Sequence, residues 1–180
     1  MSRMTAIDPA HTTGKTKDAL GAVEKLLGGV PNLFRVAANS SSALEALVGV
    51  IGATAKGTLG ARTREAIALV VAEANGCDYC LSAHTALGAK AGLSDDDMHA
   101  ARDAASRDAK TAALLRFARE LVLQRGRVGA HALEQVRAAG ASDGEVLEVV
   151  ADVVVSIFTT TINLVADTDI AFPVVRARCS

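Results

Sequence analysis

Apolar side chains recur every three or four positions along nearly the whole chain, whereas the strict alternation typical of a half-buried strand is hard to find. This pattern predicts an all-α protein. Five helices are predicted over 17–28, 63–75, 77–91, 108–124 and 130–139. Three more are predicted from their first residues: one begins at the Ser-Ala-Leu-Glu capping box at 42–45, one at the acidic segment 94–97, and one at the Ser-Asp-Gly-Glu capping box at 142–145. Residues 167–173 are expected to be extended.

Local signals support these boundaries. Thr63 is the expected N-cap of the helix 63–75, and Asn75 and Gly76 form its expected stop signal. The last predicted helix is the most apolar of the chain, with Val149, Val153 and Ile157 among its side chains. We expect a bundle in which several helices are largely buried.

Composition narrows the class of protein. A chain of 180 residues predicts one domain, 1–180, long enough to bury a core without disulfide bonds. Half of the residues are hydrophobic but only 3% are aromatic, which suits close packing of helices by Ala, Val and Leu. The net charge of -1 predicts no binding to nucleic acid.

The compartment is predicted from the same composition. Polar or acidic residues interrupt the longest apolar stretches, and the first 20 residues contain no apolar core of a signal peptide, so we expect no membrane association. Three cysteines are too few for a secreted scaffold built on disulfides. We therefore predict a cytoplasmic protein.

One segment carries more chemistry than any other. Glu65 stands at the head of an apolar run, and Cys77, Cys80 and His84 follow it. Helical positions three and four apart are neighbours, so the two thiols and the imidazole are predicted to share one helix face. Dithiol, imidazole and carboxylate together supply a reversible two-electron couple and a path for its proton. The segment therefore predicts the site of a redox enzyme.

The roles within this segment follow from position. Cys80 is the candidate nucleophile, because it lies one turn from His84 and because helix amides and an imidazolium both stabilise a thiolate. Cys77 is expected to resolve the sulfenic acid of Cys80 by closing a disulfide. His84 is expected to handle the proton, since imidazole titrates near neutral pH. Glu65 either relays that proton or complements the helix dipole, and Tyr79 either packs or donates its hydroxyl to the thiol site.

Two alternatives stay open. The ligand types Cys77, Cys80 and His84 also suit zinc, although a closed site needs a fourth ligand and the sequence offers only Cys179 as a further thiol. The dithiol also suits a thiol–disulfide exchange protein or a redox sensor. The redox-enzyme hypothesis requires no cofactor beyond the dithiol. The remaining histidines, expected to be solvated, are His11, His99 and His131.

The same segment resembles a known family. It satisfies the pattern E-x11-C-x-x-C-x3-H without a gap. The sequence resembles the AhpD-like alkylhydroperoxidases, within the wider carboxymuconolactone decarboxylase family. The resemblance extends from residues 31–34 to the Asn163 region and the tail 167–173, so the core of the domain is expected over about 31–170. The signature is carried here by Glu65, Leu69, Asn75, Cys77, Tyr79, Cys80, Ala83 and His84.

The resemblance implies an AhpD-like helical bundle that assembles as a homo-oligomer, a trimer or a hexamer. It implies a peroxidase that reduces alkyl hydroperoxides, with Cys80 peroxidatic, Cys77 resolving, and Glu65 and His84 in the proton relay. The reductant it implies is a dithiol or lipoyl-type partner. In the best-known members a relay histidine precedes the second cysteine, and Tyr79 stands at that position here.

Overall fold

The structure, a computed structural model, describes residues 2–178, and within that range it contains helices and no strand. The prediction of an all-α protein is therefore confirmed. The elements are η1 (Pro9–His11), α1 (Gly14–Leu27), α2 (Asn32–Ala37), α3 (Ser41–Thr54), α4 (Ala61–Ala74), α5 (Asp78–Lys90), α6 (Asp95–Arg102), α7 (Ala109–Leu123), α8 (Ala130–Ala138) and α9 (Asp143–Ala166).

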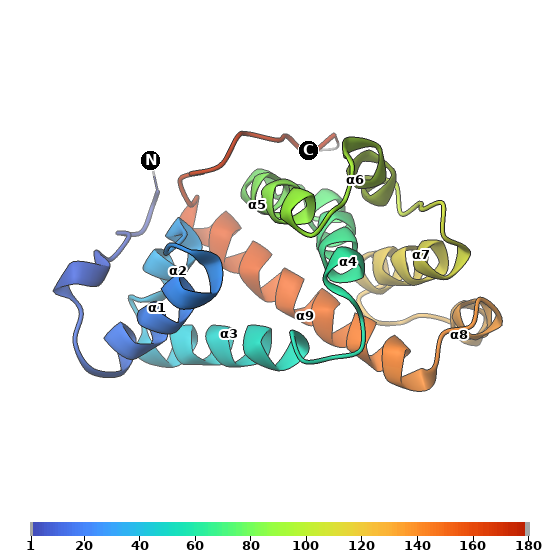
Figure 1. Cartoon of the computed structure of the whole chain (residues 1–180), viewed down its shortest axis with the longest axis horizontal. Helices are drawn as coiled ribbons and strands as arrows, with labels where there is room; N and C mark the ends of the chain where they lie inside the picture. The colour runs from blue at the N-terminus through green and yellow to red at the C-terminus, as the bar shows by residue number, and fades with distance from the viewer. Residues whose placement is uncertain (1, 179–180) are drawn as a thin grey trace.

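The long helix α9 runs diagonally through the molecule (Figure 1). Helices α1, α2 and α3 lie at one end, and α7 and α8 lie at the other (Figure 1). Helix α4 packs against α5, α6, α7 and α9, which makes it the centre of the bundle. Its residues 66–72 are all buried, as expected for a helix whose sequence is apolar on every side.

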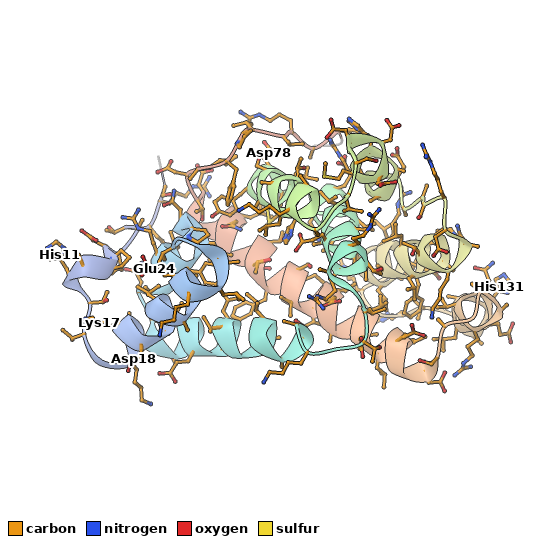
Figure 2. The ribbon with its side chains drawn as sticks, in the orientation of Figure 1. His11, Lys17, Asp18, Glu24, Asp78 and His131 are labelled. Carbon is orange, nitrogen blue, oxygen red and sulfur yellow. A yellow bond between two sulfur atoms is a disulfide. The ribbon has the colours of Figure 1, made fainter. Side chains whose placement is uncertain are left out.

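Helix α1 has the opposite character, because it is amphipathic and covers the surface. Leu20 and Val23 are buried on its inner face. Lys17, Asp18 and Glu24 are exposed, and Lys17 and Asp18 point away from the bundle (Figure 2). Figure 2 also shows that charged side chains cover the periphery of the molecule.

Two predicted N-caps are wrong, by two residues at α3 and by three residues at α4. The N-cap of α3 is Ser40 and not Ser42. The backbone of Ser40 is extended, and its side-chain hydroxyl accepts a hydrogen bond from the amide of Ala43 at 3.3 Å. Helix α4 begins after Gly60, whose carbonyl already accepts the amide of Arg64 at 3.1 Å. Thr63 therefore lies inside the first turn and cannot cap it.

The other helix boundaries agree with the prediction to within about three residues. The capping box predicted at 142–145 is confirmed, and the acidic segment 94–97 forms a second capping box that was not predicted. Ser94 and Ser142 each accept the amide three residues ahead, and the acidic side chain at that position returns the hydrogen bond. The tail 167–178 contains no helix, in agreement with the extended segment expected at 167–173.

By length and composition α9 could cross a membrane, and 44% of its most apolar stretch is buried inside the molecule. Core helices pass the same test, and α9 packs against α2, α3, α4, α5 and α7. We therefore interpret α9 as the core helix of this bundle.

The buried face of α9 is unusually polar. Residues with small relative exposure on this face are Asp152, Ser156, Thr159, Thr160 and Asn163, interspersed with valines. Burial raises the pKa of the Asp152 carboxyl from 3.8 to about 6, although the charge of Arg64 opposes the shift. The carboxylates of Glu148 and Glu65 add to the increase.

This burial predicts a pH-dependent cost to folding. The folded chain holds the proton of Asp152 to a higher pH than the unfolded chain does, so ionisation of this carboxyl destabilises the fold. The cost is absent below about pH 4, grows from about pH 4 to 6 and is complete above. Asp152→Asn is therefore expected to raise the free energy of unfolding by up to about 3 kcal/mol at pH 7.5 and by much less at pH 4.5.

Urea denaturation of the wild type and of Asp152→Asn at the two pH values measures this effect. The control is Asp143→Asn, since Asp143 is exposed and bonded to Arg137, which lowers the pKa of its carboxyl. That variant is expected to show no gain in stability as the pH rises. A gain for Asp152→Asn that is equal at both pH values would contradict the assignment of the cost to the charge.

Candidate functional site

The connection between α4 and α5 sets the position of the two cysteines. Gly76 ends the first helix with a φ of +64°, a conformation that favours glycine. Cys77 follows as the N-cap of α5, and its sulfur accepts the amide of Cys80 at 3.2 Å. The Sγ atoms of Cys77 and Cys80 are joined as a disulfide, with their Cα atoms 5.3 Å apart.

Both cysteines are nearly inaccessible, but their surroundings differ. Cys77 is 1% exposed and does not line the cavity described below, whereas Cys80 is 3% exposed and does line it. The sulfur of Cys80 lies 3.3 Å from the hydroxyl oxygen of Thr160 and 3.5 Å from the amide nitrogen of Asn163, both on α9. These two donors are placed to stabilise negative charge on this sulfur once the disulfide is open.

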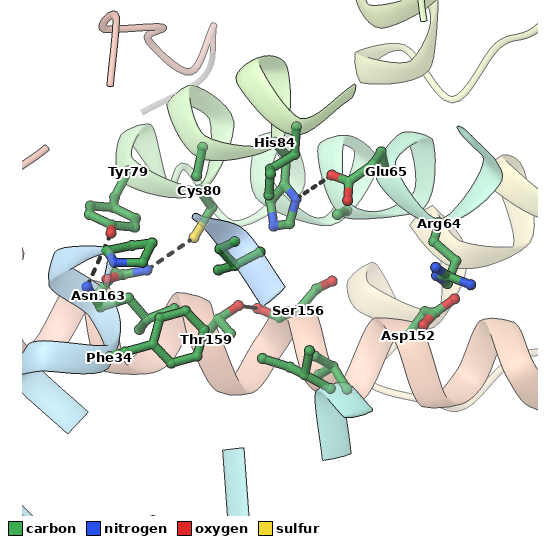
Figure 3. Close-up of a pocket in the computed structure, with 18 of the residues that line it drawn as sticks. Phe34, Arg64, Glu65, Tyr79, Cys80, His84, Asp152, Ser156, Thr159 and Asn163 are labelled. Carbon is green, nitrogen blue, oxygen red and sulfur yellow. Dashed lines mark hydrogen bonds and ion pairs between the residues drawn. The ribbon is translucent and has the colours of Figure 1, made fainter. Parts of the chain in front are cut away.

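The predicted imidazole and carboxylate are brought together across α4 and α5. His84 Nδ1 lies 2.8 Å from Glu65 Oε2 (Figure 3). An ionised carboxylate only accepts hydrogen bonds, so Nδ1 carries the proton and Nε2 is left to exchange one. The side chains of His84 and Glu65 are 23% and 22% exposed, so the pair is partly shielded from water.

Tyr79 is buried in the wall of the same site. Its hydroxyl accepts the amide of Leu33 at 3.1 Å, and its ring meets Phe172 edge to face with centroids 5.9 Å apart. Burial raises the pKa of the Tyr79 phenol, against the effect of the Leu33 amide. Within residues 2–178 no hydrogen bond joins this hydroxyl to either cysteine. The contacts agree with the packing interpretation, and a role for Tyr79 in proton transfer stays a prediction.

These side chains surround one cavity of about 300 Å³. Cys80, His84 and Glu65 form one wall, and α9 forms the wall opposite (Figure 3). Much of the remaining lining is apolar, and it includes Leu26, Leu27, Leu33, Phe34, Ile51, Ala68, Leu87, Val155 and Phe172. The cavity therefore presents a thiol, a proton carrier and an apolar surface to the same small molecule.

The contribution of α9 was not predicted from the sequence. Asp152, Ser156, Thr159 and Asn163 line the cavity, at spacings that place them on one helix face. The signal lies in the sequence as polar residues at helical period inside an apolar run. It is easily overlooked, because apolar residues outnumber the polar ones in this helix.

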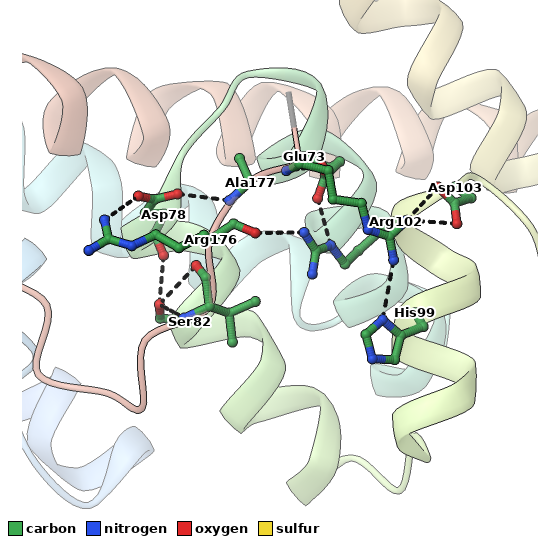
Figure 4. A network of polar contacts seen from close by, with 10 residues as sticks. Glu73, Asp78, Ser82, His99, Arg102, Asp103, Arg176 and Ala177 are labelled. Atoms are coloured by element: carbon green, nitrogen blue, oxygen red, sulfur yellow. Dashed lines mark hydrogen bonds and ion pairs between the residues drawn. The ribbon is translucent and has the colours of Figure 1, made fainter. Parts of the chain in front are cut away.

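The C-terminal tail closes over the outside of α5 (Figure 4). Asp78, in the first turn of α5, accepts the amide of Ala177 at 2.8 Å and pairs with the guanidinium of Arg176 at 2.6 Å. The nearly buried Arg102 donates to the Arg176 carbonyl and pairs with Glu73 at 2.6 Å. Glu73 therefore forms a nearly buried ion pair with a structural role. This network holds the start of α5, and with it the cysteines, from the side away from the cavity.

The other histidines lie outside the site. The side chains of His11 and His131 are 84% and 80% exposed, at opposite ends of the molecule (Figure 2). His99 is also exposed. Within residues 2–178 no three His, Cys, Asp or Glu side chains gather to hold a metal ion. The zinc alternative gains no support there, and Cys179 lies outside the described residues.

Comparison with known proteins identifies the segment that carries this site. The family model described as the carboxymuconolactone decarboxylase family matches residues 41–124, which span α3 to α7. Among curated proteins, none matches the sequence.

Solved structures share the fold over nearly the whole chain. A peroxidase-related protein from Ralstonia eutropha JMP134, described as an alkylhydroperoxidase AhpD core, is 22% identical with a TM-score of 0.82, covering 93% of this chain and 91% of that one. A peroxidase-related protein from Silicibacter sp. TM1040 is 23% identical with a TM-score of 0.74, covering 95% and 92%. The debrominase Bmp8, in complex with tribromopyrrole, is 19% identical with a TM-score of 0.79, covering 94% of each chain.

The matched segment contains Glu65, both cysteines and His84, and the fold around it is the one shared by these structures. Residues 41–124 are thus similar to the carboxymuconolactone decarboxylase family, and the chain has an AhpD-like fold.

Proposed function

We propose that the protein is a thiol-dependent peroxidase that reduces alkyl hydroperoxides. The observation that carries this proposal is the cavity in which Cys80, His84 and Glu65 meet, with Cys77 bonded to Cys80 behind it. An alkyl group suits the apolar lining, and the peroxy group suits the polar wall. Fold alone does not select this activity, since the neighbours include a debrominase.

The reaction begins with the reduced pair. The Cys80 thiolate attacks the terminal oxygen of the hydroperoxide, and the O–O bond breaks. The leaving alkoxide takes up a proton and becomes an alcohol. Cys80 is then a sulfenic acid. The Cys77 thiol attacks its sulfur, water leaves, and the disulfide forms. A dithiol or lipoyl-type reductant returns the pair to two thiols and becomes a disulfide itself.

His84 and Glu65 form the proposed proton relay. Glu65 holds the Nδ1 proton of His84, so that Nε2 takes the proton of the Cys80 thiol and returns it to the leaving oxygen. The carboxylate also stabilises the imidazolium that exists between these two transfers. Tyr79 is proposed to shape the wall beside Cys80, where its hydroxyl fixes the amide of Leu33.

The exposure of the two sulfurs supports the division of roles. Cys80 lines the cavity and Cys77 does not, so a hydroperoxide reaches Cys80 first. The alternative function is thiol–disulfide exchange or redox sensing with little peroxidase activity. It uses the same pair, but a sensor oxidises once and then stops. The cytoplasm is the proposed compartment.

We also propose that the outer face of α9 is covered by a second copy of the chain. Its apolar side chains recur at alternating spacings of three and four, which is the pattern of a helix–helix seam. Leu147, Val154 and Leu164 are 68%, 57% and 48% exposed. The seam consists of the apolar Leu147, Val150, Val154, Ile157 and Leu164, together with Thr161, whose hydroxyl donates to the carbonyl of Ile157.

A two-fold contact lets the same seam face itself, so one helix supplies both sides. The segment 149–166 contains a single charged residue, Asp152, and that residue is buried on the opposite face. From Val150 to Leu164, no charged side chain of α9 therefore opposes such a contact. A two-fold contact of this kind is compatible with a hexamer, the larger of the two expected assemblies.

Cys80→Ser is expected to reduce donor-dependent hydroperoxide turnover by about a thousandfold or more, because the nucleophile is lost. Cys77→Ser is expected to consume about one equivalent of hydroperoxide per chain and then stop, since Cys80 oxidises but no disulfide forms. Stopped-flow consumption of cumene hydroperoxide with dihydrolipoamide measures both. Cys179→Ser is the matched control and should retain turnover. Equal turnover by Cys80→Ser and wild type would refute the peroxidase assignment.

Glu65→Gln keeps a hydrogen-bond acceptor for His84 but removes the charge that stabilises its protonated form. We expect kcat/KM for the hydroperoxide to fall by about a hundredfold. The pH dependence of the rate should change with it, which a purely structural role would not cause. Glu24→Gln, an exposed residue of α1, is the control. An unchanged rate and pH profile would remove Glu65 from the relay.

Val154→Glu places a charge in the centre of the α9 seam and is expected to reduce the mass of the assembly in sedimentation velocity. The wild type should sediment as a multiple of the 18.4 kDa chain. Ala138→Glu makes the same change at an exposed position of α8 and should leave the mass unchanged. A wild type that sediments as a single chain would contradict the proposed contact.

A further inference from the structure

The polar wall of the cavity extends well beyond the thiol. Asn163 lies beside Cys80, and Asp152 lies at the other end of the row, beside Arg64 (Figure 3). These two positions of α9 are eleven residues apart, which corresponds to about 16 Å along a helix. Ser156 and Thr159 lie between them on the same face. The cavity is therefore long enough to contact a substrate far from its reacting group.

Asp152 is the one acidic residue that α9 contributes to this wall. It is 8% exposed, and within residues 2–178 its Oδ2 is buried without a hydrogen-bond partner. Buried polar atoms in folded proteins nearly always have a partner, so an orphaned carboxylate oxygen requires an explanation. Asp152 lines the cavity, so a rotation of its carboxylate toward a group bound there would give this oxygen the missing donor.

The neighbouring charges restrict the kind of group that fits. Arg64 of α4 lies beside Asp152 (Figure 3), Glu65 of the same helix is paired with His84, and Glu148 lies one turn away on α9. The guanidinium of Arg64 donates to the carbonyl of Leu59 at 2.8 Å, and Arg64 is not within ion-pair distance of Asp152 among the described contacts. Glu148 is fully occupied, since it accepts the amides of Thr58 and Leu59.

An anionic ligand would be repelled by the Asp152 carboxylate, and a cationic ligand would be repelled by the guanidinium of Arg64 beside it. A neutral donor avoids both repulsions and satisfies Oδ2. We propose that Asp152 binds a neutral hydrogen-bond donor, such as a hydroxyl, at the end of an elongated apolar hydroperoxide remote from its peroxy group. The substrate class rests on the proposed peroxidase function, whereas the binding of the donor does not.

The apolar lining accounts for the rest of such a molecule. Phe34, Ile51 and Val155 lie along the cavity together with Leu27 and Leu87. A chain of methylene groups contacts these side chains while its two polar ends reach Cys80 and Asp152. The arrangement makes Asp152 a specificity-determining residue.

Binding is tested with product analogues that do not react. The two probes are a long-chain primary alcohol and the alkyl methyl ether with the same number of heavy atoms. Only the alcohol carries a hydrogen-bond donor. Isothermal titration of the full chain is expected to show the alcohol binding about ten- to a hundredfold more tightly, as a hydrogen bond to a charged acceptor predicts. Asp152→Leu should bind the two compounds equally.

The controls separate Asp152 from its surroundings. Asp152→Asn keeps the size of the side chain and a weaker acceptor, so it should show a reduced preference even if the leucine variant folds poorly. Asp143→Asn, which changes an exposed carboxylate of the same helix, should keep the full preference. Equal binding of alcohol and ether by wild type would overturn the inference, as would a preference that survives in Asp152→Leu.

Turnover gives the second readout. The ratio of kcat/KM for an ω-hydroxyalkyl hydroperoxide to that for its ω-methoxy analogue should exceed about ten in wild type and approach one in Asp152→Leu. If neither compound is reduced while the alcohol still binds preferentially, the peroxidase function fails and the donor site stands. If both are reduced at equal rates and bind equally, the donor site fails and the peroxidase function stands.

Discussion

The burial of α4 on all sides is the constraint on which the rest of the molecule depends. Residues 66–72 have no face turned to water, so other helices must surround them. Helices α5, α6, α7 and α9 do so. Glu65 stands immediately before this segment, and His84 stands on the helix packed beside it. The packing of α4 against α5 therefore fixes the distance between a carboxylate and an imidazole that are 19 positions apart.

The division of faces on α9 follows from the same arrangement. A surface helix usually turns its apolar face inward and its polar face to water. In α9 the inward face carries Asp152, Ser156 and Asn163, while Val154 and Leu164 are exposed. The helix supplies a polar wall to the cavity and an apolar surface to the outside. Such a conflict with the usual pattern is expected where function, and not stability, selects the residues.

The sequence predicted the helices and the cysteine motif well because both are local. Helical period and caps such as Ser142 act within a few residues, and the spacing of Cys77, Cys80 and His84 is a property of one turn. The start of α4 was missed because Thr63 looks like a cap but lies after the first accepting carbonyl. Hydrogen bonding at the backbone decides that boundary, and the residue type does not.

The wall of the cavity could not be predicted in the same way. Asn163 reaches Cys80 across 83 positions of sequence, and Asp152 faces Arg64 only because α9 crosses α4. These contacts depend on how helices cross, which no local pattern contains. The polar face is also hard to recognise along the chain, because the valines around Asp152 outnumber it.

The sulfur of Cys77 caps the helix whose first turn carries its disulfide partner, Cys80. The same sulfur atom therefore accepts a backbone hydrogen bond at the start of α5 and forms the disulfide bond. Reduction and oxidation change the bonding of the atom that begins α5, so the two-electron equilibrium and the local folding equilibrium form a single thermodynamic cycle. The difference in fold stability between the two oxidation states must equal the difference in reduction free energy between the folded and unfolded chain. The stability of the fold therefore contributes to the reduction potential of the cysteine pair.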